Sequence, residues 1–177
     1  MAGAEGTARR GLLLAAAGAV LGGCGFRPLY GSGGEADAGV QARLAEVNVQ
    51  LIPERSGQLL RQALQTRLER GRSAIARRYD LSVQYALSAE SIGIQSDSSG
   101  SRVRLIGVAS WALLAQDAQR TTLVSGSARE VDAVNVINQQ FFAAELTSAA
   151  VQRRMVDAVA EQIATQLAVY FARKSTV

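Results

Sequence analysis

Hydrophobic and polar residues alternate along much of the chain, and the period of the alternation predicts its secondary structure. Between residues 43 and 52 apolar side chains stand at nearly every second position, which predicts a strand with one buried face that ends at Pro53. From Ser56, a residue able to cap a helix, the apolar spacing changes to three and four, and Gly71 closes the predicted helix. The apolar positions of this helix are Leu60, Ala63, Leu64 and Leu68.

A long hairpin is predicted next, because the period of two returns at Tyr79 and continues toward Ile94. Polar residues at 96–101 predict a turn, after which a strand runs from Arg102 to about Leu114. This strand is apolar on both of its alternating faces, which predicts that it lies in the centre of the sheet.

The last third of the chain predicts one more strand and one long helix. Residues 121–131 form a strand with small polar residues in its middle, which is typical of a sheet edge, and residues 132–140 give no clear prediction. From about Phe142 the period is 3.6 for some thirty residues, which predicts an amphipathic helix packed on the core. Its apolar stripe consists of Val151, Met155, Val156, Val159, Ile163, Leu167, Tyr170 and Phe171.

The predicted order is therefore β-α-β-β-β-α, an α+β fold with two helices packed on one face of a four-stranded mixed sheet. The helical crossover predicts a parallel first pair of strands if the two are neighbours, and the hairpin predicts an antiparallel pair. The sheet face without helices must meet solvent or a partner, so it has room for a lipid-binding or protein-binding surface.

Composition excludes most enzyme classes. Among its 177 residues the chain has no histidine, one cysteine and a single lysine, Lys174, near the C-terminus. Imidazole-based triads, histidine or cysteine metal sites, disulfides and the P-loop all lack their residues, and no Ser-x-x-Lys or Gly-x-Ser-x-Gly motif occurs. Asp157 and Glu161, four apart on the last helix, are expected to form ordinary surface ion pairs. We therefore predict no enzyme, no catalytic residue, no metal and no cofactor. An anchored envelope hydrolase is the remote alternative.

The N-terminus carries an export signal. The pair Arg9-Arg10 precedes an apolar stretch, residues 11–23, that is shorter than the roughly 20 residues of a membrane span. Residues 21–24, Leu-Gly-Gly-Cys, fit the lipobox of bacterial lipoproteins, which predicts cleavage after residue 23 and lipidation of Cys24. Two alternatives stay open: a buried Cys24 thiol with cleavage at residues 15–17, and a twin-arginine route in place of ordinary secretion.

Three segments follow from these observations. Residues 1–23 are the predicted signal peptide, residues 24–39 the lipidated N-terminus with a glycine-rich flexible linker, and residues 40–177 a single domain. Gly25 stands where an aspartate would retain many lipoproteins at the inner membrane, so the outer membrane is favoured. The formal net charge of +4 is small and scattered along the chain, and it does not indicate a nucleic-acid binder.

Residues 21–31, Leu-Gly-Gly-Cys-Gly-Phe-Arg-Pro-Leu-Tyr-Gly, closely resemble the start of the mature chain in the LptE family of lipopolysaccharide-assembly lipoproteins. The resemblance continues through Ile52-Pro53, the helix start at 56–61 and the Tyr170-Phe171 pair of the last helix. It covers nearly the whole mature chain, and its N-terminal run is the most specific part.

The resemblance implies a non-enzymatic lipoprotein, lipid-anchored in the cell outer membrane with its domain on the periplasmic side. Members of the family plug the lumen of the LptD β-barrel, help assemble it and assist delivery of lipopolysaccharide to the outer leaflet. The rival interpretation is an auxiliary lipoprotein of an ABC-type phospholipid transport system.

Lipopolysaccharide is also a ligand of the family, and its phosphates favour paired arginines. Arg102 and Arg104, two apart on one strand face beside the turn, are our candidates for contacting it. The alternative is that both are solvated charges at a hairpin end. Arg120, Arg129 and the Arg77-Arg78 pair are weaker candidates.

Overall fold

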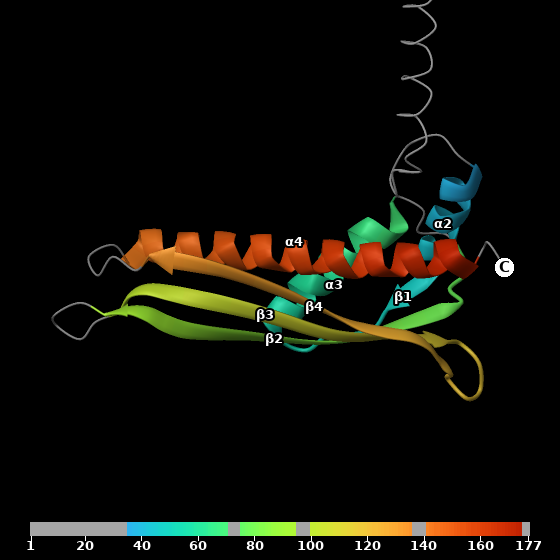
Figure 1. Cartoon of the computed structure of the whole chain (residues 1–177), viewed down its shortest axis with the longest axis horizontal. Coiled ribbons are helices and arrows are strands. Elements are labelled where there is room, and N and C mark those ends of the chain that lie inside the picture. The colour runs from blue at the N-terminus through green and yellow to red at the C-terminus, as the bar shows by residue number, and fades with distance from the viewer. Residues whose placement is uncertain (1–34, 71–74, 95–99, 136–140, 175–177) are drawn as a thin grey trace, which may run out of the picture. The chain divides into compact units, whose positions relative to one another are not determined.

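The computed structural model describes residues 35–70, 75–94, 100–135 and 141–174. Their element order is α-β-α-β-β-β-α, an α+β fold with a four-stranded mixed sheet and three helices (Figure 1). The elements are α2 (Glu35–Ala45), β1 (Val47–Val49), α3 (Glu54–Glu69), β2 (Tyr79–Ile94), β3 (Gly100–Ala115), β4 (Thr122–Asn135) and α4 (Phe141–Lys174). The predicted order and helix count therefore missed one helix, α2. Cys24, Gly71 and most of the turn predicted at 96–101 lie outside the described residues.

The predicted first strand, 43–52, is wrong over most of its length. Leu44 is buried in the last turn of α2, the strand that follows is only three residues long, and Leu51 is 73% exposed. Val40 and Leu44, which are four apart and both buried, lie on the core face of this helix. Helix α2 also begins at Glu35, so the last five residues of the predicted linker, 35–39, are helical.

Helix α3 matches the predicted apolar spacing but not the predicted ends. Leu60, Leu64 and Leu68 are fully buried, as the spacing of three and four requires. The helix starts two residues before Ser56, with Pro53 at the N-cap position and no side-chain cap. It ends on Arg70 in the left-handed conformation (φ 37°).

The sheet has the order β1-β2-β3-β4. β1 pairs parallel to residues 79–81 of β2, and the β2–β3 and β3–β4 pairs are antiparallel, as predicted. β3 is central and β4 is an edge strand, which also confirms the prediction.

Helix α4 lies along the strands and contacts β3 and β4, while α3 contacts α4, β1 and β2 (Figure 1). Seven of the eight predicted stripe residues of α4 are buried, and Tyr170 is half-buried. Phe171, fully buried near the C-terminal end of α4, contacts the rings of Tyr79 and Tyr170, with centroids 5.3 Å away in both cases. The described part of the chain holds no helix whose length and apolar character suffice to cross a membrane.

Candidate functional site

One face of the sheet has no helix or strand over it within the described residues; we call it the open face (Figure 1). Along β3 the odd-numbered residues from Leu105 to Leu113 are buried, so the even-numbered ones point to the open face. Val108 is 40% exposed there. The apolar residues on both faces of this strand had predicted its central place in the sheet, and the sheet face without helices was expected to meet solvent or a partner. The exposure of Val108 fits that expectation, because the helices cover only the odd-numbered face.

The open face combines an apolar centre with arginines around it. In the register of the sheet Ile106 pairs with Val131, and Val108 pairs with Arg129. Val131, like Val108, is 40% exposed. Because paired residues point to the same face, these four side chains form one mixed apolar and basic surface.

Arg102 and Arg104 share one face of the strand, as predicted, and this is the open face, at its end nearest Ile94 and Gly100. Arg104 pairs with Glu90 across the strands, and its Nη1 lies 3.7 Å from Glu90 Oε2. Both side chains are about half exposed, so solvent weakens this ion pair. Arg102 is exposed and forms no ion pair with the described residues.

Of the weaker candidates, Arg129 lies on the open face, whereas Arg120 and the Arg77-Arg78 pair have partners elsewhere. Arg120 Nη2 lies 3.4 Å from Asp80 Oδ2. Burial raises the pKa of Asp80, but hydrogen bonds from Asn48 and Gln116, together with the charge of Arg120, lower it on balance. Arg120 therefore belongs to a local network that stabilises the start of β2.

The Arg77-Arg78 pair joins structural elements. Arg77 donates to the carbonyl oxygens of Ala45 and Val47 and forms a 2.7 Å ion pair with Glu69. It therefore links α2, β1 and α3. The Arg78 guanidinium lies 3.9 Å from Glu46.

The two acids singled out on α4 also form ion pairs, as predicted, and their partner is on another helix. Arg67 of α3 lies 3.3 Å from Asp157 and 3.0 Å from Glu161. Among the described residues no group of three or more potential metal ligands comes together.

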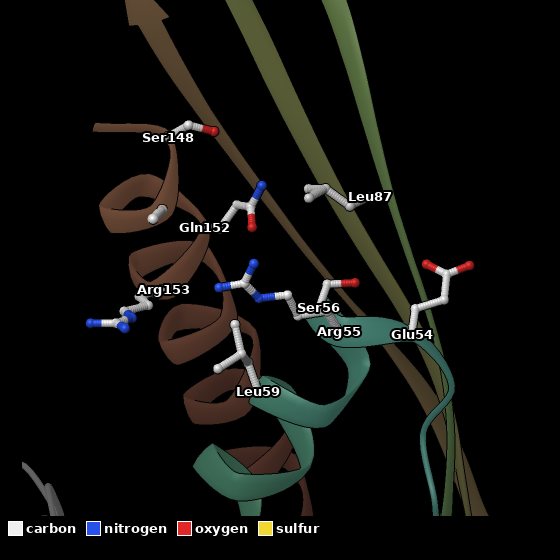
Figure 2. Close-up of a pocket in the computed structure, with 9 residues that line it drawn as sticks. Glu54, Arg55, Ser56, Leu59, Leu87, Ser148, Gln152 and Arg153 are labelled. Atoms are coloured by element: carbon white, nitrogen blue, oxygen red, sulfur yellow. The ribbon is translucent and has the colours of Figure 1, made fainter. Parts of the chain in front are cut away.

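A pocket of about 390 Å³ lies where the N-terminus of α3 meets α4 and β2 (Figure 2). Its apolar part comes from Leu59, Leu87 and Ala149. Arg55 points from α3 toward Gln152 of α4, whereas the Glu54 carboxylate points away from both (Figure 2). The remaining lining residues are Ser56, Ser148 and Arg153.

Sequence reasoning missed this pocket. Arg153 lies at a polar position of the last predicted helix, and Arg55 precedes the predicted helix start at Ser56, so neither was singled out. The pocket exists because α3 begins beside Leu87 while α4 continues past that point, and no local sequence pattern indicates where the end of one helix lies against another.

Comparison with known proteins assigns the family. The family description "LptE: Lipopolysaccharide-assembly" matches residues 44–167. The chain belongs to the LptE family. This confirms the resemblance found in residues 21–31, and the matched residues lie in the domain, outside that N-terminal run.

Solved structures agree with this membership. A lipoprotein of Caulobacter crescentus CB15 is 25% identical, with a TM-score of 0.59 over 76% of this chain and 97% of that chain. A minor lipoprotein of Acinetobacter baumannii is 14% identical (TM-score 0.52; 70% and 90% covered), and the rare lipoprotein B of Shewanella oneidensis is 11% identical (TM-score 0.50; 73% and 96% covered). The last two show a shared fold. No curated protein matches the chain.

Proposed function

We propose that this LptE-family chain is an outer-membrane lipoprotein that plugs and helps assemble the LptD β-barrel and contacts lipopolysaccharide during its delivery to the outer leaflet. Membership of a lipopolysaccharide-assembly family supports the role. The single structural observation that carries it is the open face, where Arg102 and Arg104 adjoin exposed apolar side chains. Lipopolysaccharide has phosphates that the arginines can bind and acyl chains that can pack on the apolar side chains.

The membrane attachment in this proposal depends on Cys24. Diacylglycerol on its thiol, with a further acyl chain on the amine freed by cleavage after residue 23, would give stable anchoring, which a single chain does not provide. Mass spectrometry of the mature protein would identify the lipidated N-terminal peptide. In Cys24→Ala we expect the protein to lose its membrane attachment.

The barrel partner is tested by purifying the tagged lipoprotein from detergent-solubilised outer membranes. We expect one large β-barrel protein to be recovered in equal amount. Recovery with inner-membrane transporter components and no barrel would overturn the proposal in favour of the phospholipid-transport interpretation.

Lipid contact is tested separately with Arg102→Glu combined with Arg104→Glu. We expect binding of purified lipopolysaccharide to fall at least tenfold while the barrel is still recovered, because both charges face the same surface. The matched control is Arg173→Glu combined with Lys174→Glu, which changes the net charge equally at the last turn of α4. If both double variants lose lipopolysaccharide binding equally, the loss is due to the change in net charge, and a specific contact at Arg102 and Arg104 is contradicted.

Glu90→Gln refines this test. The Glu90 carboxylate lies 3.7 Å from the Arg104 guanidinium, so a lipid phosphate must compete with this carboxylate for the arginine. Removing that charge should tighten lipopolysaccharide binding a few-fold, and the gain should disappear when Arg104 is also replaced. A tightening that persists without Arg104 would assign the effect to general repulsion by Glu90.

A further inference from the structure

The two edges of the sheet differ in how their outward backbone groups are hydrogen-bonded. At the β4 edge, α4 supplies side chains that bond to the strand backbone: Gln162 accepts from Arg129 N and donates to Arg129 O, both at 3.2 Å. Gln166 donates to Ser127 O at 3.0 Å. Helix α4 therefore satisfies backbone groups of β4 that a further strand would need.

At the other edge, strand pairing stops early. β1 pairs only with residues 79–81, and the last hydrogen bond on that side of β2 among the described residues runs from Gln50 N to Leu81 O at 3.0 Å. Regular pairing of β2 with β3 nevertheless continues as far as Ser91, where an irregularity in register follows. About ten residues of β2 thus have a strand on one side only among the described residues.

The direction of the backbone groups follows from those contacts. Tyr79 N and Leu81 O both bond toward β1, and residues along a strand alternate between its two sides. The N–H and C=O groups of Val83, Tyr85, Leu87 and Ala89 therefore face away from β3; we call these groups the β2 edge. No hydrogen bond from any described residue reaches them.

The β2 edge carries few of the features that prevent strand addition. Between residues 83 and 92 there is no proline and no lysine. Residues 88–91 are all exposed, and three of them are Ser88, Ala89 and Ser91, which have small side chains. The only charge, Glu90, points to the open face, where it pairs with Arg104.

The pocket beside Leu87 indicates what an added strand would carry. A strand paired with β2 would lie about 4.8 Å from it, and its side chains on the helix side would reach the apolar part of the pocket and Arg55. Neither Arg55 nor Arg153 forms an ion pair with another described residue. The complementary strand therefore has an apolar residue for Leu87 and an acidic residue for Arg55.

We propose that the β2 edge is a docking site for an extended, acid-bearing strand of a protein partner, which joins the sheet by main-chain hydrogen bonds. This inference rests on the proposed function in one respect: the partner to be tested is the barrel protein. The strand would add a fifth member to the sheet on the side opposite the glutamine contacts.

Hydrogen exchange of the full-length lipoprotein, alone and in complex with the barrel, tests the site directly. We expect the outward amides of Val83, Tyr85, Leu87 and Ala89 to exchange at least tenfold more slowly in the complex. The amides of the alternate residues, Gln84 among them, already bond to β3 and should change little. Protection of both sets alike would indicate general burial and overturn the proposal.

Two pairs of variants test its chemistry. Ala89→Pro removes an outward N–H and leaves the inward bonds to β3, whereas Ala89→Val keeps that N–H. We expect Ala89→Pro, and not Ala89→Val, to reduce the barrel recovered per tagged protein at least tenfold. Arg55→Glu should reduce it more than Arg55→Gln. If Ala89→Pro does not fold, the exchange measurement on the unmodified protein still decides the question.

The outcomes separate this inference from the proposed function. If the unmodified protein recovers no barrel, the proposed function fails, and with it the partner named here. If it recovers the barrel while the outward amides exchange as fast as in the free protein, only the β2 edge inference fails. Protection of those amides in the free protein that rises with its concentration would assign the edge to a second copy of this chain and also overturn the proposal.

Discussion

At the residue scale, Tyr85 has a hydroxyl group in an unfavourable place. Its oxygen is buried without a hydrogen-bond partner among the described residues, and this burial raises the pKa of Tyr85. A buried polar group without a partner costs about 1–3 kcal/mol. We expect Tyr85→Phe to increase the free energy of unfolding by about 1 kcal/mol in urea titrations.

Gly107 provides the matched test of this packing. A Cβ atom at Gly107 would lie 2.7 Å from the Tyr85 hydroxyl oxygen and 3.3 Å from the Tyr85 ring, so Gly107→Ala should destabilise the fold. Part of that loss should be recovered in the double variant with Tyr85→Phe. If the two changes are additive, the contact between them is not the cause.

Asp132 gives stability a dependence on acid. Its carboxylate accepts hydrogen bonds from Arg154 at 2.9 Å and from the Ala133 amide at 2.7 Å, and these bonds, the Arg154 bond first, lower the pKa of Asp132 from 3.8. Because the pKa of Asp132 is lower in the folded than in the unfolded chain, its ionised carboxylate stabilises the fold at any pH above the unfolded-state pKa. This contribution is lost as the pH falls through the folded-state pKa. The free energy of unfolding of Asp132→Asn should therefore fall less than that of the unmodified protein between about pH 5 and pH 2. Arg154→Gln should behave similarly, and parallel acid curves for all three proteins would contradict this assignment.

At the scale of elements, the fold depends on contacts between α4 and the β4 edge. Gln162→Ala should lower the free energy of unfolding by about 1 kcal/mol and speed exchange of the Arg129 amide, because water replaces the side chain. Gln162→Glu keeps the acceptor for that amide and loses the donor to its carbonyl. Its Arg129 amide should therefore stay closer to the unmodified rate, and equal rates in both variants would exclude the direct bond as the cause.

The periodic elements were predictable from the sequence for a physical reason. Seven buried residues of α4 and three of α3 stand at helical spacing because each helix has one face on the core, and a period records such a face. Helix α2 and the three-residue β1 were mispredicted because they are short, and Leu44 fits either period. Solvent or a partner was expected on the sheet face without helices, but the sequence could not indicate that Val108 lies there, since β3 has apolar residues on both faces.

The candidate site was predictable in part. Arg102 and Arg104 lie on one strand face as their spacing required, but their apolar neighbours Val131 and Ile106 come together only through the register of β3 with β4. The β2 edge could not be predicted at all, because it depends on β1 ending after Val49.

At the scale of the molecule, the core is uneven along the sheet. Toward β1, Leu113 is fully buried, and its partner across the sheet, Leu81, pairs with Val49 of β1. Toward Ile94 and Gly100, Leu105 belongs to a cluster with Val134, Val151 and Met155, beside Leu87 and Val103, which are partly buried. We expect Leu113→Ala to cost about 4 kcal/mol and Leu105→Ala about 2 kcal/mol, measured by urea unfolding. Equal costs would contradict an uneven core.

The contrast between the two sheet edges limits what can be built from this chain. An open-ended polymer built by edge-to-edge strand pairing needs two free sheet edges on every subunit, one for each of its two neighbours. Here Gln162 and Gln166 bond to the backbone of the β4 edge, so a further strand can join the sheet only at the β2 edge. The molecule therefore terminates a sheet and does not propagate one, a property that would keep copies apart if the proposed lipid anchor concentrates them on a membrane surface.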